Sequence, residues 1–178
     1  MEEMRIRPAR AGDLDPVWAL ARRAVNWMNQ QGNPQWGADY PTRDLYAGDI
    51  VRGVLWCAEE SGAIAGVACI TPEKTGEYPA EIWQAPGPAL VIHRMAVEPA
   101  AQGRGIARAL FAQAEKLAHM RKMAALHIDT YTENTRMQAI IRSLGFVQRG
   151  SIHLHGRPLP YPCFEKLLLP AVCPDTVE

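Results

Sequence analysis

The pattern that most constrains the fold lies between residues 89 and 131. A nearly continuous apolar run, "ALVIHRMAV", predicts a buried strand that stops before Pro99. A glycine-rich segment comes next, and an apolar stripe at helical spacing then predicts a helix over 103–119. The run "AALHIDTY" predicts a second buried strand. A strand, a helix and a strand in this order predict two neighbouring parallel strands joined by a crossover helix.

The rest of the chain reads as further strands and helices, without a repeat or a linker that would divide it. The expected elements are, in order, a strand over 4–9, a helix over 11–32, a helix over 42–53, a hairpin over 54–72, a brief strand near 81–83 within a loop, a helix over 134–145, and an antiparallel pair from 146–154 and 160–169. We expect one domain over 3–169 and a C-terminal tail over 170–178.

Charge and composition exclude several classes of function. The 178 residues include 19 basic and 19 acidic side chains, so the net charge gives no case for nucleic-acid binding. The N-terminus lacks an apolar signal core and no stretch is long enough to cross a bilayer, so we expect a cytoplasmic protein that binds no membrane. Cys57, Cys69, Cys163 and Cys173 form no CxxC pair, so we expect reduced, mostly buried thiols and no metal site.

The segment "QGRGIA" is suited to bringing a negatively charged group close to the backbone. A helix N-terminus exposes unpaired N–H groups, and glycine leaves no Cβ to block a ligand. Arg104 and Arg108 add positive charge, so the segment suits a diphosphate. A P-loop is excluded because no lysine follows either glycine. A dinucleotide-binding loop is a weak match, because Arg108 stands at the third glycine position, although Asp129 is spaced for a ribose contact. A helix start with incidental glycines is the remaining alternative.

The stretch "HRMAVEPAAQGRGIARAL" resembles the fourth strand, pyrophosphate loop and third helix of the GNAT N-acetyltransferase superfamily, and "NTRMQAIIRSLGF" resembles the helix that follows. The resemblance covers most of the chain. It implies an α+β fold whose mixed central sheet, with its flanking helices, opens between splayed parallel strands 4 and 5 to admit acetyl-CoA. The coenzyme A contacts that it implies are Met95, Ala96, Val97, Gln102, Gly103, Arg104, Gly105, Ile106, Ala107, Arg108, Asn134, Met137 and Ile141.

The resemblance also implies how the chemistry is supported. The backbone N–H of Met95 is expected to stabilise charge on the thioester oxygen. His93, expected on the same strand face as Met95, is the first candidate for the base that takes a proton from the attacking amine, and Glu81 is the second. Ile141 stands where the family's usual acid, a tyrosine, is found. Tyr131 is then a substitute acid, unless transfer proceeds without one.

The acceptor pocket is the part of the function that the sequence specifies least. In the family this pocket is built by the loop between the first two helices and by the last hairpin, here residues 33–44 and 153–164. Aromatic walls and an arginine that binds a carboxylate would fit a small amine bearing a carboxylate, or a peptide N-terminus. The candidate residues are Trp36, Tyr40, Trp83, Arg94 and Arg157.

The sequence therefore predicts transfer of an acetyl group from acetyl-CoA to a primary amine of a small molecule or peptide, by direct attack in a ternary complex. The alternative is a non-catalytic acyl-CoA-binding or sensing module on the same fold, and Ile141 is the residue that keeps it open. Arg142 is expected in solvent, with a contact to adenine-side phosphates as its alternative. A homodimer is a possible assembly.

Overall fold

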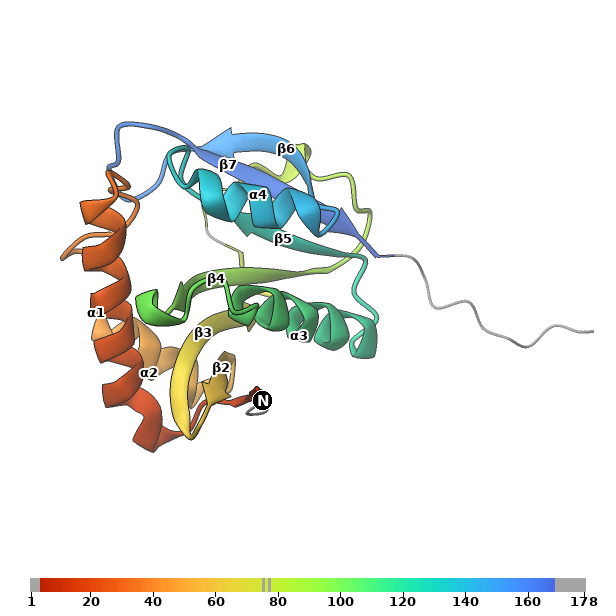
Figure 1. The fold of residues 1–178 in the computed structure, drawn as a ribbon. Helices are drawn as coiled ribbons and strands as arrows, with labels where there is room; N and C mark the ends of the chain where they lie inside the picture. The colour runs from red at the N-terminus through yellow and green to blue at the C-terminus, as the bar shows by residue number, and fades with distance from the viewer. Residues whose placement is uncertain (1–3, 75, 77, 169–178) are drawn as a thin grey trace, which may run out of the picture.

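The strands of this chain form a seven-stranded sheet in the order β1-β2-β3-β4-β5-β7-β6 (Figure 1). The computed structural model describes residues 4–74, 76 and 78–168. The strands are β1 (Arg5–Pro8), β2 (Leu55–Glu60), β3 (Ala63–Thr71), β4 (Ala89–Val97), β5 (Ala125–Asp129), β6 (Val147–Ile152) and β7 (Tyr161–Leu167). The helices are α1 (Leu14–Gln30), α2 (Arg43–Val51), α3 (Ile106–Met120) and α4 (Thr135–Ser143). β4 and β5 are parallel and every other neighbouring pair is antiparallel, so the sheet is mixed.

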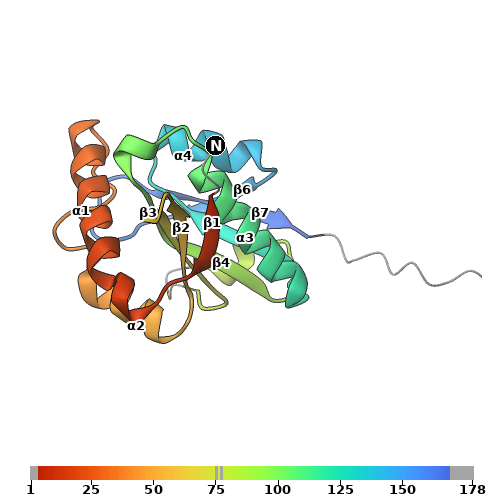
Figure 2. The same cartoon turned by 60° about the horizontal axis from the view of Figure 1, so that its bottom comes forward.

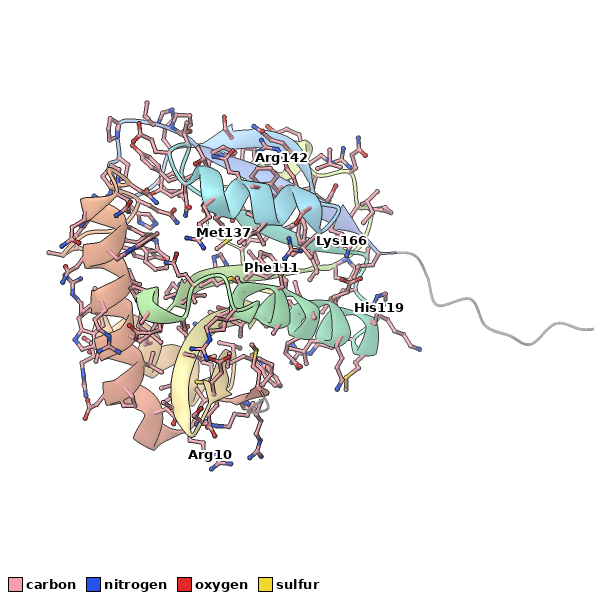
Figure 3. The ribbon with its side chains drawn as sticks, viewed as in Figure 1. Arg10, Phe111, His119, Met137, Arg142 and Lys166 are labelled. Carbon is pink, nitrogen blue, oxygen red and sulfur yellow. The ribbon has the colours of Figure 1, made fainter. Side chains whose placement is uncertain are left out.

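The helices cover both faces of this sheet (Figures 1 and 2). α3 and α4 pack on one face, where Leu110 and Ile141 share a buried cluster with Ile92 of β4. Phe111 lies between α3 and α4, and its ring meets that of Phe146 edge-on with centroids 5.7 Å apart (Figure 3). α1 and α2 bury a second cluster against the opposite face. Each apolar stripe predicted from the sequence thus packs against one face of the sheet.

The structure confirms the predicted order of strands and helices, with one exception in the loop before β4. The brief strand expected near residues 81–83 was wrong, because Ala80–Ile82 is a single turn of 3-10 helix. The backbone N–H groups of Gln84 and Ala85 donate to the buried Glu165 carboxylate at 3.0 and 3.1 Å. A side chain of β7 therefore binds the backbone of this loop where a neighbouring strand was expected.

β4 and β5 separate half-way along β4. Their parallel register pairs residues 89–92 with residues 125–128 and ends there. β4 nevertheless stays paired with β3 as far as Val97. In Figure 1 the two parallel strands move apart toward α1. The predicted splay of the parallel strands is confirmed. From His93 onward, the edge of β4 that faces β5 has no strand partner within the described sheet.

A β-bulge interrupts β4 where it leaves β5. Val67 pairs with Ala96 and Cys69 pairs with His93, so β4 has one more residue than β3 between these two pairs. Arg94 takes up part of the extra length in a left-handed conformation, with a φ of 49°. Such a φ is uncommon for a residue other than glycine, and the sequence carries no local sign of it.

The bulge changes which side chains share a face of β4. Met95 packs with Ile92 in the cluster against α3. Val91, two residues before His93, packs in a separate cluster on the other face of the sheet. The expectation that His93 and Met95 share a strand face was therefore wrong, because the extra residue reverses the alternation of side chains.

The cysteines and the chain ends complete the comparison with the sequence. Cys57, Cys69 and Cys163 are buried free thiols, and burial raises the pKa of each to about 12. Cys173 and the tail expected over 170–178 lie outside the described residues. None of the described helices is long and apolar enough to span a bilayer. The described part of the chain also holds no group of three or more His, Cys, Asp and Glu side chains arranged to bind a metal ion.

Candidate active site

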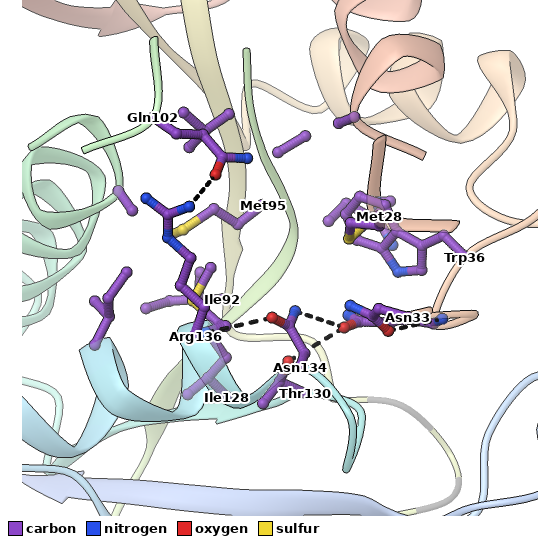
Figure 4. A pocket seen from close by; sticks show the side chains of 18 of the residues that line it. Met28, Asn33, Trp36, Ile92, Met95, Gln102, Ile128, Thr130, Asn134 and Arg136 are labelled. Carbon is purple, nitrogen blue, oxygen red and sulfur yellow. Dashed lines mark hydrogen bonds between the residues drawn. The ribbon is translucent and has the colours of Figure 1, made fainter. Parts of the chain in front are cut away.

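A cavity of about 1010 Å³ opens where β4 and β5 separate. Its lining comes from these two strands, from the loop before α3, from the start of α4, from the end of α1 with the loop that follows, and from the loop before β7 with the first residue of β7. Figure 4 shows Gln102 and Met95 on one side of the cavity and Met28 and Trp36 on the other. Elements that are distant in the sequence thus meet at the unpaired edge of β4.

The loop before α3 presents bare backbone to this cavity. Gly103 and Gly105 line it with φ of 81° and 85°, a conformation that favours glycine. A Cβ built at either position meets no protein atom within 4 Å. α3 begins at Ile106, directly after the loop, and a helix start offers unpaired N–H donors and the positive end of the helix dipole. This donor set fits a diphosphate.

The arginines near the loop differ in where they point. Arg108 lines the cavity. Arg136, which sequence reasoning did not single out, also lines it and donates a hydrogen bond to the Gln102 side-chain oxygen at 2.5 Å (Figure 4). Arg104 is outside the cavity lining, largely exposed, and 3.3 Å from the Glu60 carboxylate. Arg108 and Arg136 are therefore the cations that line the cavity beside the loop, and sequence reasoning passed over Arg136 although it lies in the stretch "NTRMQAIIRSLGF".

The unpaired edge of β4 directs two N–H groups into the cavity. The Glu98 N–H donates to the Ala65 carbonyl of β3 at 2.8 Å. N–H groups point alternately to the two sides of a strand, so those of Val97 and Met95 face away from β3. Met95, Ala96 and Val97 all line the cavity. The edge can therefore donate hydrogen bonds to a ligand from Met95 and Val97.

His93 lines the cavity beside the bulge. Its Nε2 atom lies 3.2 Å from the Glu73 carbonyl oxygen, so Nε2 carries the proton and Nδ1 the lone pair. Burial lowers the pKa of His93 to about 4, so the ring is neutral at pH 7. It can accept a proton there, though less strongly than an ordinary histidine. Glu81, the second candidate base, is exposed and lies outside the cavity lining.

Tyr131 and Ile141 both lie outside the cavity lining. Tyr131 is fully buried, and its hydroxyl accepts a hydrogen bond from the Leu159 N–H at 3.2 Å. Ile141 is a fully buried member of the cluster against α3. The tyrosines among the described lining residues are Tyr40 and Tyr161, and burial raises the pKa of both. Sequence reasoning did not single out Tyr161, the first residue of β7, although it lies in the segment 153–164 expected to build the acceptor pocket.

The candidate acceptor aromatics separate into two groups. Trp36 and Tyr40 line the cavity, and their rings meet edge-on with centroids 6.3 Å apart. Trp83 lies outside the lining and stacks on buried His127 with ring centroids 3.7 Å apart. The segment that holds Trp83 folds over the β5–β7 half of the sheet. There Trp83 packs against the buried cluster that includes Val91.

The two candidate arginine clamps are each held by a carboxylate of the chain. Arg94 lines the cavity, but its Nε and Nη2 atoms donate to fully buried Asp49 at 2.7 and 2.8 Å. Arg157 lies 2.8 Å from the Asp39 carboxylate and is outside the lining of this cavity. Both guanidinium groups are therefore already paired, which weakens the case for an acceptor that bears a carboxylate.

α4 places its predicted residues in different surroundings. Asn134 caps the helix, since its side-chain oxygen accepts from the Met137 N–H at 3.3 Å, and both residues line the cavity. Arg142 lies on the side of α4 away from α3 (Figure 3), with its guanidinium 5.2 Å from the centroid of the Phe164 ring. Arg142 is thus exposed, as expected, and its guanidinium also packs over the buried Phe164 ring.

A family comparison supports the interpretation of this geometry. The model of the acetyltransferase (GNAT) family matches residues 21–146. The chain belongs to this family. The matched span contains the splayed strands, the glycine loop and α4, and membership of the GNAT family implies acyl transfer from acetyl-CoA. A sequence search of curated proteins returned no match for this GNAT chain.

Solved structures share the fold of this GNAT chain. A GNAT-family acetyltransferase from Streptococcus agalactiae is 26% identical over 93% of this chain and 96% of its own, with a TM-score of 0.78. An N-acetyltransferase from Thermoplasma acidophilum, solved in complex with coenzyme A, is 14% identical over 93% and 99%, with a TM-score of 0.71. The ribosomal-protein-S18-alanine N-acetyltransferase from Escherichia coli is 16% identical over 99% of both chains, with a TM-score of 0.66.

Proposed function

We propose that this GNAT chain transfers an acetyl group from acetyl-CoA to a primary amine of a small molecule or peptide, by direct attack in a ternary complex. The observation that best supports the proposal is the unpaired edge of β4, where Met95 and Val97 line a cavity of about 1010 Å³. Gly103 and Gly105 line the same cavity. A glycine loop that would suit a diphosphate and a strand edge whose N–H groups would pair with a ligand therefore line one space.

The residues present fit acetyl-CoA. The backbone N–H groups that follow Gly105, with Arg108 and Arg136 beside them, would hold its diphosphate. The backbone of Val97 would pair with its pantetheine amides as a neighbouring strand does. When bound, acetyl-CoA supplies an acyl carbon attached to a sulfur leaving group.

The groups of the chain would stabilise charge and move a proton. The Met95 N–H would donate to the carbonyl oxygen as negative charge develops on it. The acceptor amine is protonated at neutral pH, because such amines have a pKa of about 10, and it must lose a proton to react. Neutral His93 on the cavity wall takes that proton, directly or through water. No acid is assigned, because Tyr131 and Ile141 lie outside the cavity lining.

A thiol-release assay with a panel of amines tests the proposal, alongside calorimetric titration of coenzyme A. We expect coenzyme A to bind and its release from acetyl-CoA to depend on the acceptor. Binding without acceptor-dependent release would support the alternative, a non-catalytic acyl-CoA-binding or sensing module. Absence of binding would contradict both functions. A cytoplasmic location and a homodimer stay predictions.

A further inference from the structure

Arg94, in the bulge of β4, has a backbone conformation that its own side chain disfavours. Its φ of 49° lies in the left-handed region, and a bulge with a left-handed residue usually has glycine at that position. A residue with a Cβ stays in this region only where the surrounding structure holds it there, and such residues cluster at functional sites. His93 and Met95, the two neighbours of Arg94, both line the cavity. The contacts that hold Arg94 therefore bear on the proposed reaction.

α2 holds both the side chain and the backbone of Arg94. The Nε and Nη2 atoms of Arg94 donate to the two oxygens of the Asp49 carboxylate at 2.7 and 2.8 Å. The Tyr46 hydroxyl donates to the Arg94 carbonyl oxygen at 3.4 Å. Asp49 and Tyr46 are three positions apart on α2, so they lie on one face of the helix, and both are fully buried. One buried face of α2 thus fixes the bulged residue at two points.

The remaining contacts of this cluster also come from the chain itself. The Arg94 guanidinium lies 3.3 Å from the Cys69 sulfur of β3 and 3.5 Å from the Tyr40 hydroxyl. The Asp49 carboxylate also accepts a hydrogen bond from Arg52, whose Nη2 atom is 2.7 Å away. Asp49 therefore keeps a charged partner even when the side chain of Arg94 is removed.

The bulge decides which way the Met95 N–H points. The Ile70 N–H donates at 2.8 Å to the carbonyl of Val54, the residue before β2, so the preceding residue of β3, Cys69, faces β4. Its partner His93 then directs its own N–H toward β3. In an unbroken strand Met95, two positions later, would also direct its N–H toward β3. The extra residue reverses this alternation, so the Met95 N–H faces the cavity.

We propose that Asp49 is a positioning residue for acetyl transfer: together with Tyr46 it holds Arg94 in the left-handed conformation that turns the Met95 N–H toward the thioester oxygen. This inference rests on the proposed transfer and adds to it a residue outside the described cavity lining. A donor whose direction is fixed before the reaction stabilises developing charge without further reorganisation.

Two variants of Arg94 test the conformation itself. Arg94→Gly and Arg94→Ala both remove the guanidinium, and they differ by one Cβ, which disfavours the left-handed conformation. We expect kcat of Arg94→Ala to be about tenfold below that of Arg94→Gly, because a smaller fraction of the alanine variant has the Met95 N–H in place. The rate is measured by thiol release from acetyl-CoA with the most active amine of the panel, in variants shown to be folded by circular dichroism. Coenzyme A has no acyl carbonyl and should bind both variants equally well.

A second pair of variants assigns the effect to Asp49. Asp49→Asn removes the charge that holds Arg94 and should lower kcat by about tenfold. Adding Arg94→Gly to it should restore kcat to the level of Arg94→Gly alone, because glycine adopts the left-handed conformation without an anchor. Asp44→Asn removes the same charge from an exposed position of α2 and should keep full kcat.

The infrared band of the thioester carbonyl reports the Met95 donor without any acceptor. The probe is acetyl-CoA with a ¹³C label at this carbonyl, bound to each variant. A hydrogen bond to the oxygen weakens the C=O bond and lowers its stretching frequency. The frequency should be lower in wild type, in Arg94→Gly and in the double variant than in Arg94→Ala and Asp49→Asn.

The outcomes separate this inference from the function on which it rests. Equal kcat and equal frequency in the Arg94→Gly and Arg94→Ala variants would overturn the inference while acetyl transfer stands. A loss confined to the KM for the amine in both variants would assign the guanidinium to acceptor binding and would also overturn it. If the band shifts as expected but no amine drives coenzyme A release, the positioning role stands and the proposed transfer fails. If Arg94→Ala does not fold, Asp49→Asn compared with the double variant decides, and a double variant no better than Asp49→Asn overturns the inference.

Discussion

The Oε1 atom of Gln35 accepts a hydrogen bond from the Nδ2 atom of Asn134 at 2.8 Å. The same oxygen accepts from the Thr130 hydroxyl at 3.3 Å and from the Tyr131 N–H at 3.4 Å. The Gln35 carbonyl accepts from the Tyr161 hydroxyl at 2.9 Å. One buried residue thus joins the loop after α1 to the end of β5, to the start of α4 and to β7. The two walls of the cavity are positioned relative to each other through it.

Gln35→Ala should lower the free energy of unfolding by about 2 kcal/mol, because a buried donor left without an acceptor costs about 1–3 kcal/mol. Thr130 and Tyr131 are the buried residues whose donors lose that acceptor. Urea denaturation followed by tryptophan fluorescence measures the loss. Gln84→Ala, at an exposed position, is the control and should cost less than about 0.5 kcal/mol. Equal losses in the two variants would show that Gln35 does not join the walls.

Gly105→Val should weaken coenzyme A binding by at least about tenfold, or about 1.4 kcal/mol. The branched side chain would fill the space beside the backbone that the diphosphate must approach. Gly53→Val is the matched control, because its φ of 68° imposes a similar backbone strain outside the cavity lining. Calorimetric titration should show normal affinity in the control. Unchanged affinity in a folded Gly105→Val variant would remove the diphosphate assignment of this loop.

His93→Gln should lower the turnover rate by roughly a hundredfold while coenzyme A binding stays near normal, since base catalysis is commonly worth that much. Burial lowers the pKa of His93 to about 4, so its own titration should be complete well below pH 7. A rise in rate above pH 7 would then report loss of a proton from the acceptor amine. His119→Gln, at an exposed position on α3 (Figure 3), should keep full turnover. Near-full turnover of His93→Gln at saturating acceptor would make His93 a structural residue.

The stability of the wild-type chain should fall as the pH is lowered below about 6.5. The pKa of His93 is lowered on folding, so below pH 6.5 the unfolded chain binds a proton that the folded chain refuses until about pH 4. Between pH 7.5 and pH 5 this difference amounts to about 2 kcal/mol. Urea denaturation across this range should therefore show a steeper loss for wild type than for His93→Gln. Identical slopes would contradict the lowered pKa.

Local patterns were enough to predict much of the architecture. The apolar run before Pro99, the glycine segment and the helical stripe specify a strand, loop and helix because each depends on neighbouring residues. The resemblance carried by "QGRGIA" then placed the splay between the correct strands. Such features are visible in a sequence because their physical causes lie within a few residues.

The missed features depend on contacts between distant residues. Gln35 is a lone polar residue in a loop, and its role appears only when Asn134, 99 positions away, comes within 2.8 Å. The left-handed conformation of Arg94 depends on a register difference between two strands. That difference moved His93 and Met95 to opposite faces. Trp83 looked like an acceptor residue because its segment has no pattern that would direct it onto His127.

The short seam between β4 and β5 has a mechanical consequence. The pairing of residues 89–92 with residues 125–128 joins the two parts of the described sheet, β1–β4 and β5–β7. Longer antiparallel ladders hold each part together, so a small rotation about the seam would leave the ladders of both parts intact. Such a rotation widens or narrows the opening between the strand ends. Such a rotation also has to stretch the Gln35 hydrogen bonds that join the two walls, so the network that positions the walls also limits how far the opening can widen.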